Sequence, residues 1–204
     1  FALINQGITF ALTNYQLAFL WQLEQMQMLY YALMLFATVI VAFMIVPPLS
    51  GRLGKKNATI LLAVISLVFN SAMYICWLLD LVPGAPENPS VLFMFSFVTI
   101  SNSAAIGMMM LTSSMMADVV EASQQETGRR SEGLFFAGYF FMQKCATGVG
   151  TFIAGMILTF ANFPQEAQPG KVDVAVLDGL ALYYMVALLT LGVVGLLILR
   201  HFPI

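Results

Sequence analysis

Charged residues are scarce in this sequence. Only 9% of its 204 residues are Asp, Glu, Lys or Arg, whereas 60% are hydrophobic. A soluble domain uses charged residues for about a quarter of its length, because they keep its surface wetted. Lipid must therefore replace water over most of this chain, which excludes a soluble protein. The sequence also lacks a run of basic residues, so it has no electrostatic footprint for nucleic acid.

The sequence is equally poor in residues that bind metals or act in nucleophilic catalysis. His201, near the C-terminal end, is the only histidine, so no histidine-based metal site or triad can be built. Cys76 and Cys145 lie in apolar stretches, where they are expected to be small buried residues rather than a disulfide or a metal site. No His-Glu-x-x-His pair, Ser/His couple or phosphate-binding glycine loop is present. We therefore expect neither an enzyme nor a bound cofactor.

Six apolar stretches are long enough to cross a membrane as helices. A helix needs about 20 apolar residues to span the hydrocarbon core, where it satisfies its own backbone hydrogen bonds. The stretches run at about 1–22, 27–49, 57–81, 91–117, 133–162 and 179–200, and polar or Pro/Gly-rich breaks separate them. The sequence thus predicts an all-α integral membrane fold of six transmembrane helices.

Basic residues are concentrated in alternate breaks. The second and fourth breaks and the C-terminal end contain Arg52, Lys55, Lys56, Arg129, Arg130 and Arg200. Because cytoplasmic loops of membrane proteins are rich in Lys and Arg, we expect these breaks and the C-terminus to be cytoplasmic, in a plasma (bacterial inner) membrane. Aromatic residues suited to a belt at the membrane surface lie near the opposite ends: Trp21, Tyr30, Tyr31, Trp77, Tyr183 and Tyr184.

Lys144 is the sharpest anomaly, because it lies eleven residues beyond Gly133 in an apolar stretch. At about 1.5 Å per residue it would be some 16 Å into the membrane, too deep for its stem to reach water comfortably. An ammonium there costs on the order of 3 kcal/mol and usually marks a functional site. None of the ten acidic residues lies at the same depth. Its counter-charge is therefore expected in a missing part of the protein, in a substrate, or replaced by water; a purely structural ion pair is the alternative.

Polar residues form stripes on three of the predicted helices. The stripes include Asn5, Thr9, Thr13 and Gln16 in the first, Ser96, Thr99, Ser103, Gly107 and Ser114 in the fourth, and Thr147, Gly148, Thr151 and Gly155 in the fifth. Such stripes either bind helices together or line an aqueous path. For Gly155 close helix packing is the preferred interpretation. Two stripes together with a buried lysine favour a path, lined by Lys144, Thr147, Gly148, Asn5, Thr9, Gln16, Thr99 and Ser103.

The fourth break concentrates charge between two long helices. Within fifteen residues it contains Asp118, Glu121, Glu126, Arg129, Arg130 and Glu132. Ion pairs at the two helix ends could form and break as the helices move, which would make this a gating network. A solvated loop of no special role is the alternative.

Two segments resemble a known family. The segment Pro47-Pro48-Leu49-Ser50-Gly51-Arg52-Leu53-Gly54-Lys55-Lys56 is similar to the cytoplasmic loop motif of the major facilitator superfamily. The acidic pair Asp118 and Glu121, the segment from Thr127 to Gly133, and Phe141-Met142-Gln143-Lys144 resemble the glycoside–pentoside–hexuronide:cation symporters, the melibiose-carrier group. The sequence departs from that pattern at Glu121, where Asp is common, and at Ala122, where Tyr often follows.

The resemblance implies a C-terminal six-helix half, residues 1–204, of a secondary active transporter. It places Lys144 near the sugar and cation sites, and Asp118, Glu121 and Arg130 in the network that closes the inward path. The main carboxylates for the coupling cation, Na+ or H+, belong to the N-terminal half, which we expect to be missing because the chain starts at Phe1. The expected activity is cation-coupled symport of a sugar or glycoside by alternating access. A relative that carries another solute such as a lysolipid, and a non-transporting scaffold or sensor, are the alternatives.

Overall fold

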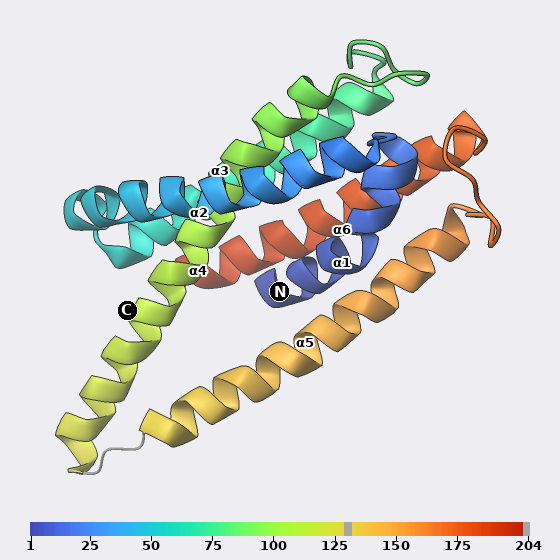
Figure 1. Ribbon diagram of the computed structural model, residues 1–204. Helices are drawn as coiled ribbons and strands as arrows, with labels where there is room; N and C mark the ends of the chain where they lie inside the picture. Colours follow the sequence, from blue (N-terminus) through green and yellow to red (C-terminus); the bar gives the residue numbers. More distant parts are fainter. Residues whose placement is uncertain (129–131, 202–204) are drawn as a thin grey trace.

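The computed structural model describes residues 1–128 and 132–201, and every regular element in these ranges is helical (Figure 1). The helices are α1 (Ala2–Tyr15), which continues into the π-helix η1 (Gln16–Leu20), α2 (Gln25–Leu53), α3 (Lys55–Leu78), α4 (Val91–Thr127), α5 (Glu132–Phe160) and α6 (Val174–His201). The fold is therefore all-α, as the apolar stretches predicted.

Five helices, α2 to α6, are long and apolar enough to cross a membrane. The first predicted span is the exception, because its regular part, α1, has 14 residues before the hydrogen bonding changes to the π pattern at Gln16. A π-helical turn inside an α-helix is uncommon and often lies at a functional site.

Two predicted breaks are much shorter than the sequence suggested. The break at 51–57 reduces to Gly54, whose φ of 77° allows α2 to end at the residue before it and α3 to begin at the residue after it. The break at 118–132 is shortened because α4 continues to Thr127 and α5 starts at Glu132. At about 1.5 Å per residue, the 37 residues of α4 extend about 55 Å, well beyond a hydrocarbon core of about 30 Å.

The helices pack in pairs. Helix α1 lies against α5, α2 against α4, and α3 against both α4 and α6. Figure 1 shows α4 and α5 extending to the lower left, so that the end of α4 and the start of α5 lie away from the α2–α3 junction. Contacts between α4 and α5 are few. We call the end with Arg52, Lys55, Lys56 and Arg200 the basic end, and the end with the 79–90 and 161–173 loops the opposite end.

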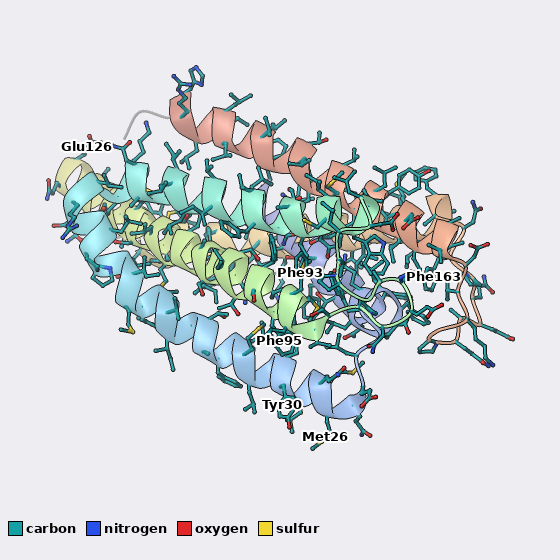
Figure 2. All side chains as sticks on the ribbon, turned by 90° about the horizontal axis from the view of Figure 1, so that it is seen from above. Met26, Tyr30, Phe93, Phe95, Glu126 and Phe163 are labelled. Carbon is teal, nitrogen blue, oxygen red and sulfur yellow. The ribbon has the colours of Figure 1, made fainter. Side chains whose placement is uncertain are left out.

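The core is densest toward the opposite end. Trp21 and Trp77 are 2% and 3% exposed, their rings pack edge to face at 5.6 Å, and the Trp77 indole Nε1–H donates to Asp178 Oδ1 at 3.0 Å. Tyr184, 1% exposed, also belongs to this core. The sequence predicts these three residues in a lipid-facing aromatic belt, and for them that prediction is wrong because they are buried. Tyr30 and Tyr183 are exposed. Figure 2 shows Met26 and Tyr30 pointing away from the bundle at the start of α2.

Non-glycine residues in the left-handed region terminate the helices at the opposite end. Asp80 and Asn162 have φ angles of 53° and 52°. In each case the next N–H reaches five residues back, from Leu81 to the Cys76 carbonyl and from Phe163 to the Leu158 carbonyl. This is the Schellman ending, in which glycine is the usual residue at the left-handed position. Phe163 then packs edge to face on Tyr15 and Phe19.

Candidate functional site

Lys144 lies in the fourth turn of α5, and its side chain is exposed on the surface of the chain. It forms no ion pair or hydrogen bond with any residue of the described part of the chain. At 100° per residue it shares one face of α5 with Gly148, Thr151 and Gly155. That face does not contact another helix, so the counter-charge of the ammonium is unassigned within residues 1–128 and 132–201. Cys145, which we expected to be buried, is exposed beside it.

The face of α5 that carries Lys144 continues as a groove toward the opposite end. The groove has a volume of about 410 Å³, and small side chains form its floor between larger apolar ones: Thr151, Phe152, Gly155, Met156, Thr159 and Phe160. A Cβ atom added at Gly148 or Gly155 would meet nothing within 4 Å. The close packing expected for Gly155 is therefore not found within the described chain.

The closest helix approach on α5 is made by a different glycine. Gly150 faces Gly7 of α1, and a Cβ on Gly150 would lie 2.9 Å from the Gly7 Cα and 2.8 Å from the Ile8 nitrogen. A Cβ on Gly7 would lie 2.6 Å from the carbonyl oxygen of Thr147. Thr147 is half-buried, and its hydroxyl donates to the Gln143 carbonyl oxygen at 2.9 Å. Gly7 and Gly150 were missed because the sequence shows two small residues but not that they meet.

The polar stripe of α1 is in contact with α6. The Asn5 Nδ2 donates to the Leu188 carbonyl oxygen at 3.2 Å, and the Thr9 and Tyr184 hydroxyls lie 2.8 Å apart. Gln16 is 6% exposed. Neither its amide nitrogen nor the Oδ1 of Asn5 has a hydrogen-bond partner among the residues that the structure describes. Unpaired buried polar atoms are costly in a membrane interior, where each normally finds a protein or water partner.

The exposed face of α1 carries other polar residues. Gln6 and Asn14 are exposed, and the Gln6 amide lies 3.7 Å from the Met109 sulfur of α4. Neither residue is among the predicted cavity residues, although their spacing of eight places them on one face of a helix. This spacing could have indicated a second polar face, but the longer polar stripe on the α6 side was chosen instead.

In α4 the predicted cavity residues face its helix partners. Thr99 donates to the Phe95 carbonyl oxygen at 2.7 Å, and Ser103 is buried with no hydrogen-bond partner in residues 1–128 and 132–201. Beside them the Asn102 amide donates to the Thr38 hydroxyl of α2 at 3.2 Å. The Asn102–Thr38 hydrogen bond joins α4 to α2, whereas the Thr99 bond stays within α4. A role in a solute path stays a prediction for Thr99 and Ser103.

The predicted gating residues are only partly brought together. Lys55 Nζ donates to both carboxylate oxygens of Asp118, at 2.7 and 2.5 Å, and so joins the start of α3 to α4. The basic loop motif and the acidic pair are separate features in the sequence, and the Lys55–Asp118 ion pair brings them together in the structure. Glu121 is exposed on the tail of α4, where Figure 2 also places Glu126. Arg129 and Arg130 lie outside the described residues.

The loop motif itself is divided between two helices. Gly51 and Arg52 belong to the last turn of α2, Gly54 forms the junction, and Lys55 and Lys56 begin α3. Arg52 is exposed, as are Gly51 and Gly54.

Comparison with known proteins identifies the family. The model of the MFS/sugar transport protein family matches residues 1–204. The putative glycoside/cation symporter YagG of Escherichia coli is 33% identical over 60 residues, which are 29% of this chain and 13% of that protein. An uncharacterized symporter of Synechocystis is 36% identical over 66 residues, 30% of this chain and 12% of that protein. No solved structure matches.

The matched segments therefore span about an eighth of each curated relative. Both relatives are named as symporters. The part of this chain that the structure describes contains five apolar helices of membrane-spanning length, as expected of an integral membrane protein. The resemblance of its loop motif and of the segment from Asp118 to Lys144 had implied the same group. The chain belongs to the MFS/sugar transport protein family of the major facilitator superfamily.

Proposed function

We propose that this chain is one six-helix half of a cation-coupled symporter for a sugar or glycoside, with Na+ or H+ as the coupling ion. The observation that carries the proposal is that the exposed Lys144 side chain has no partner among the described residues, at a position that the sequence predicts to be deep in the membrane. An ammonium facing lipid at that depth costs on the order of 3 kcal/mol. A second half that covers this face, or a hydrated path beside it, removes that cost.

The proposed second half is an N-terminal bundle of six helices. Exposed polar groups on two helices support its position: Gln6 and Asn14 on α1, and Lys144 and Thr151 on α5. Transporters of this type bind solute near the midplane, between two such halves that rock against each other. Solute hydroxyls would form hydrogen bonds with the polar groups of α1 and α5. The Lys144 ammonium would repel a bare cation from the site until a carboxylate or solute is present.

The proposed gate lies at the basic end, which we place in the cytoplasm. The Lys55–Asp118 ion pair fixes the tail of α4 against α3. Because both side chains are exposed, the pair can open at small cost and exchange partners as the halves move. Glu121 and Glu132 belong to the same proposed network, with Arg129 and Arg130.

The test is solute flux in vesicles. The intact transporter, this chain with its proposed N-terminal half, is reconstituted in proteoliposomes and supplied with 4-nitrophenyl glycosides under an inward Na+ or proton gradient. We expect uptake that one gradient drives and that collapse of the gradient abolishes. Flux of a lysolipid without flux of any glycoside would show that the solute is a lysolipid and not a sugar or glycoside. Folded protein with no flux of either solute would favour a non-transporting scaffold.

A further inference from the structure

The crossing of α1 and α5 is made by backbone against backbone. A Cβ at Gly7 would lie 2.6 Å from the Thr147 oxygen and 3.2 Å from the Gly150 Cα. A Cβ at Gly150 would collide with the Ile4 oxygen. Because the obstructing atoms belong to helix backbones, no side-chain rotation can relieve the overlap. An alanine at either position must push the helices apart.

The α1 side of this crossing is held firmly. Gly7 lies between Asn5 and Thr9, whose side chains bond to α6 at 3.2 and 2.8 Å. Ile8 and Leu12, which follow on the same helix, are 1% and 0% exposed. Helices α1 and α6 therefore form a fixed base at the level of the crossing.

The α5 side is held over only half of its length. Its buried residues are Gly150, Ala154 and Ile157, and no residue from Glu132 to Val149 is buried. Leu134 and Phe141 in this first part are 76% and 67% exposed, and contacts with α4 are few. We call residues 132–149 the arm of α5.

We infer that the Gly7–Gly150 crossing is the pivot about which the arm of α5 moves, and that it sets the position of Lys144. Gly7 and Gly150 are thus positioning residues for the lysine. The inference rests on the function proposed above, because it assigns the motion to the transport cycle. At about 1.5 Å per residue, Lys144 lies about 9 Å from the pivot and Glu132 about 27 Å from it. A tilt of roughly 10° then moves the lysine by about 1.6 Å and the tip of the arm by nearly 5 Å.

Because Lys144 lies close to the pivot, a tilt of the arm shifts the position of its ammonium only slightly and keeps it in the proposed site. It is six residues from Gly150, which at 100° per residue places it about 120° around the helix from the face that contacts α1. A tilt thus changes the distance from the ammonium to the exposed polar face of α1, while the glycine contact is kept.

The test measures motion directly and needs no solute. In the intact transporter in nanodiscs, with the other cysteines replaced, one pair of spin labels is placed at Gly138→Cys and Val194→Cys, on the arm and α6. The reference pair is at Phe160→Cys and Val194→Cys, beyond the pivot. Double electron–electron resonance is expected to give a distance distribution at least twofold wider for the arm pair. Equal widths would overturn the pivot.

A substitution series completes the test. Gly150→Ala is expected to shift the arm distribution, whereas Gly133→Ala, where a Cβ meets nothing within 4 Å, leaves it unchanged. An unchanged arm distance in folded Gly150→Ala would also overturn the pivot, and if that variant does not fold, the comparison of widths decides. Failure of the proposed function would appear separately, as absent flux in vesicles.

Discussion

Lys55 and Asp118 join the first turn of α3 to the tail of α4, with the lysine Nζ donating to both carboxylate oxygens. The two residues come from motifs 63 positions apart in the sequence. Their side chains are 39% and 52% exposed, so solvent screens the attraction. Pairs of this kind contribute at most about 1 kcal/mol to stability. The same energy, applied to one state of a two-state transporter, shifts the populations about fivefold.

Asp118→Asn or Lys55→Gln is therefore expected to change transport more than stability. We expect initial uptake to change about fivefold if the pair exists in only one state, with a shift in unfolding free energy below about 1 kcal/mol. Uptake into proteoliposomes and thermal unfolding in detergent measure the two effects. The exchanged pair Lys55→Asp with Asp118→Lys should recover part of the uptake. Recovery of none, with normal folding, would contradict a role for the pair itself.

The contact between Trp77 and Asp178 is expected to stabilise the opposite end of the bundle. Asp178→Ala leaves the buried indole N–H without its acceptor, which costs about 1–3 kcal/mol. Asp178→Asn keeps an acceptor oxygen at the same place and is the matched control, with a smaller loss. Thermal unfolding followed by tryptophan fluorescence measures both. Equal losses for the two variants would show that the carboxylate charge, and not the hydrogen bond, is what matters.

The Thr9–Tyr184 hydrogen bond is expected to couple α1 to α6. Thr9→Val and Tyr184→Phe each remove one partner of the 2.8 Å contact. In a double-mutant cycle on unfolding free energy, the coupling should be about 0.6 kcal/mol, the average for such bonds within membranes, and at most about 1.7 kcal/mol. Strict additivity of the two losses would indicate that the hydroxyls do not bond in the membrane.

Asn162 is expected to be replaceable by glycine with a gain in stability. Its φ of 52° lies in the left-handed region that glycine adopts without strain. Asn162→Gly should raise the unfolding free energy by a few tenths to about 1 kcal/mol, because the strain is relieved where a Schellman ending requires it. Asn88→Gly, at a position without positive φ, is the control and should not stabilise the protein. A loss of thermal stability in Asn162→Gly would contradict this account of the helix end.

Hydropathy was sufficient to predict the helical architecture, but not where the helices end. Apolar length locates the part of a helix that lies in lipid, whereas the tail of α4 beyond Asp118 is polar and helical, so it could not be distinguished from a loop. Pro47 and Pro48 lie inside the predicted stretch 27–49, and both are accommodated within α2. Only the positive φ of Gly54 ends that helix.

The candidate site was less predictable, because it depends on which face each helix presents. Counting along α1 found the stripe with Thr9, but could not show that this side meets α6 and that Gln6 is on the exposed side. The sequence also could not pair Gly7 with Gly150, since the two glycines are more than 140 positions apart and their contact is set by how the two helices cross. The prediction for Lys144 used composition and depth alone.

Uptake by the Lys144→Ala variant tests the central claim most directly. In proteoliposomes with the intact transporter, the account predicts that removing the ammonium lowers gradient-driven glycoside uptake at least about tenfold, because a charge at membrane depth is usually retained for function. The variant should still fold, since the side chain contacts no other helix in the described chain. Uptake at the native rate and with the native KM would contradict a role for Lys144 in the transport path.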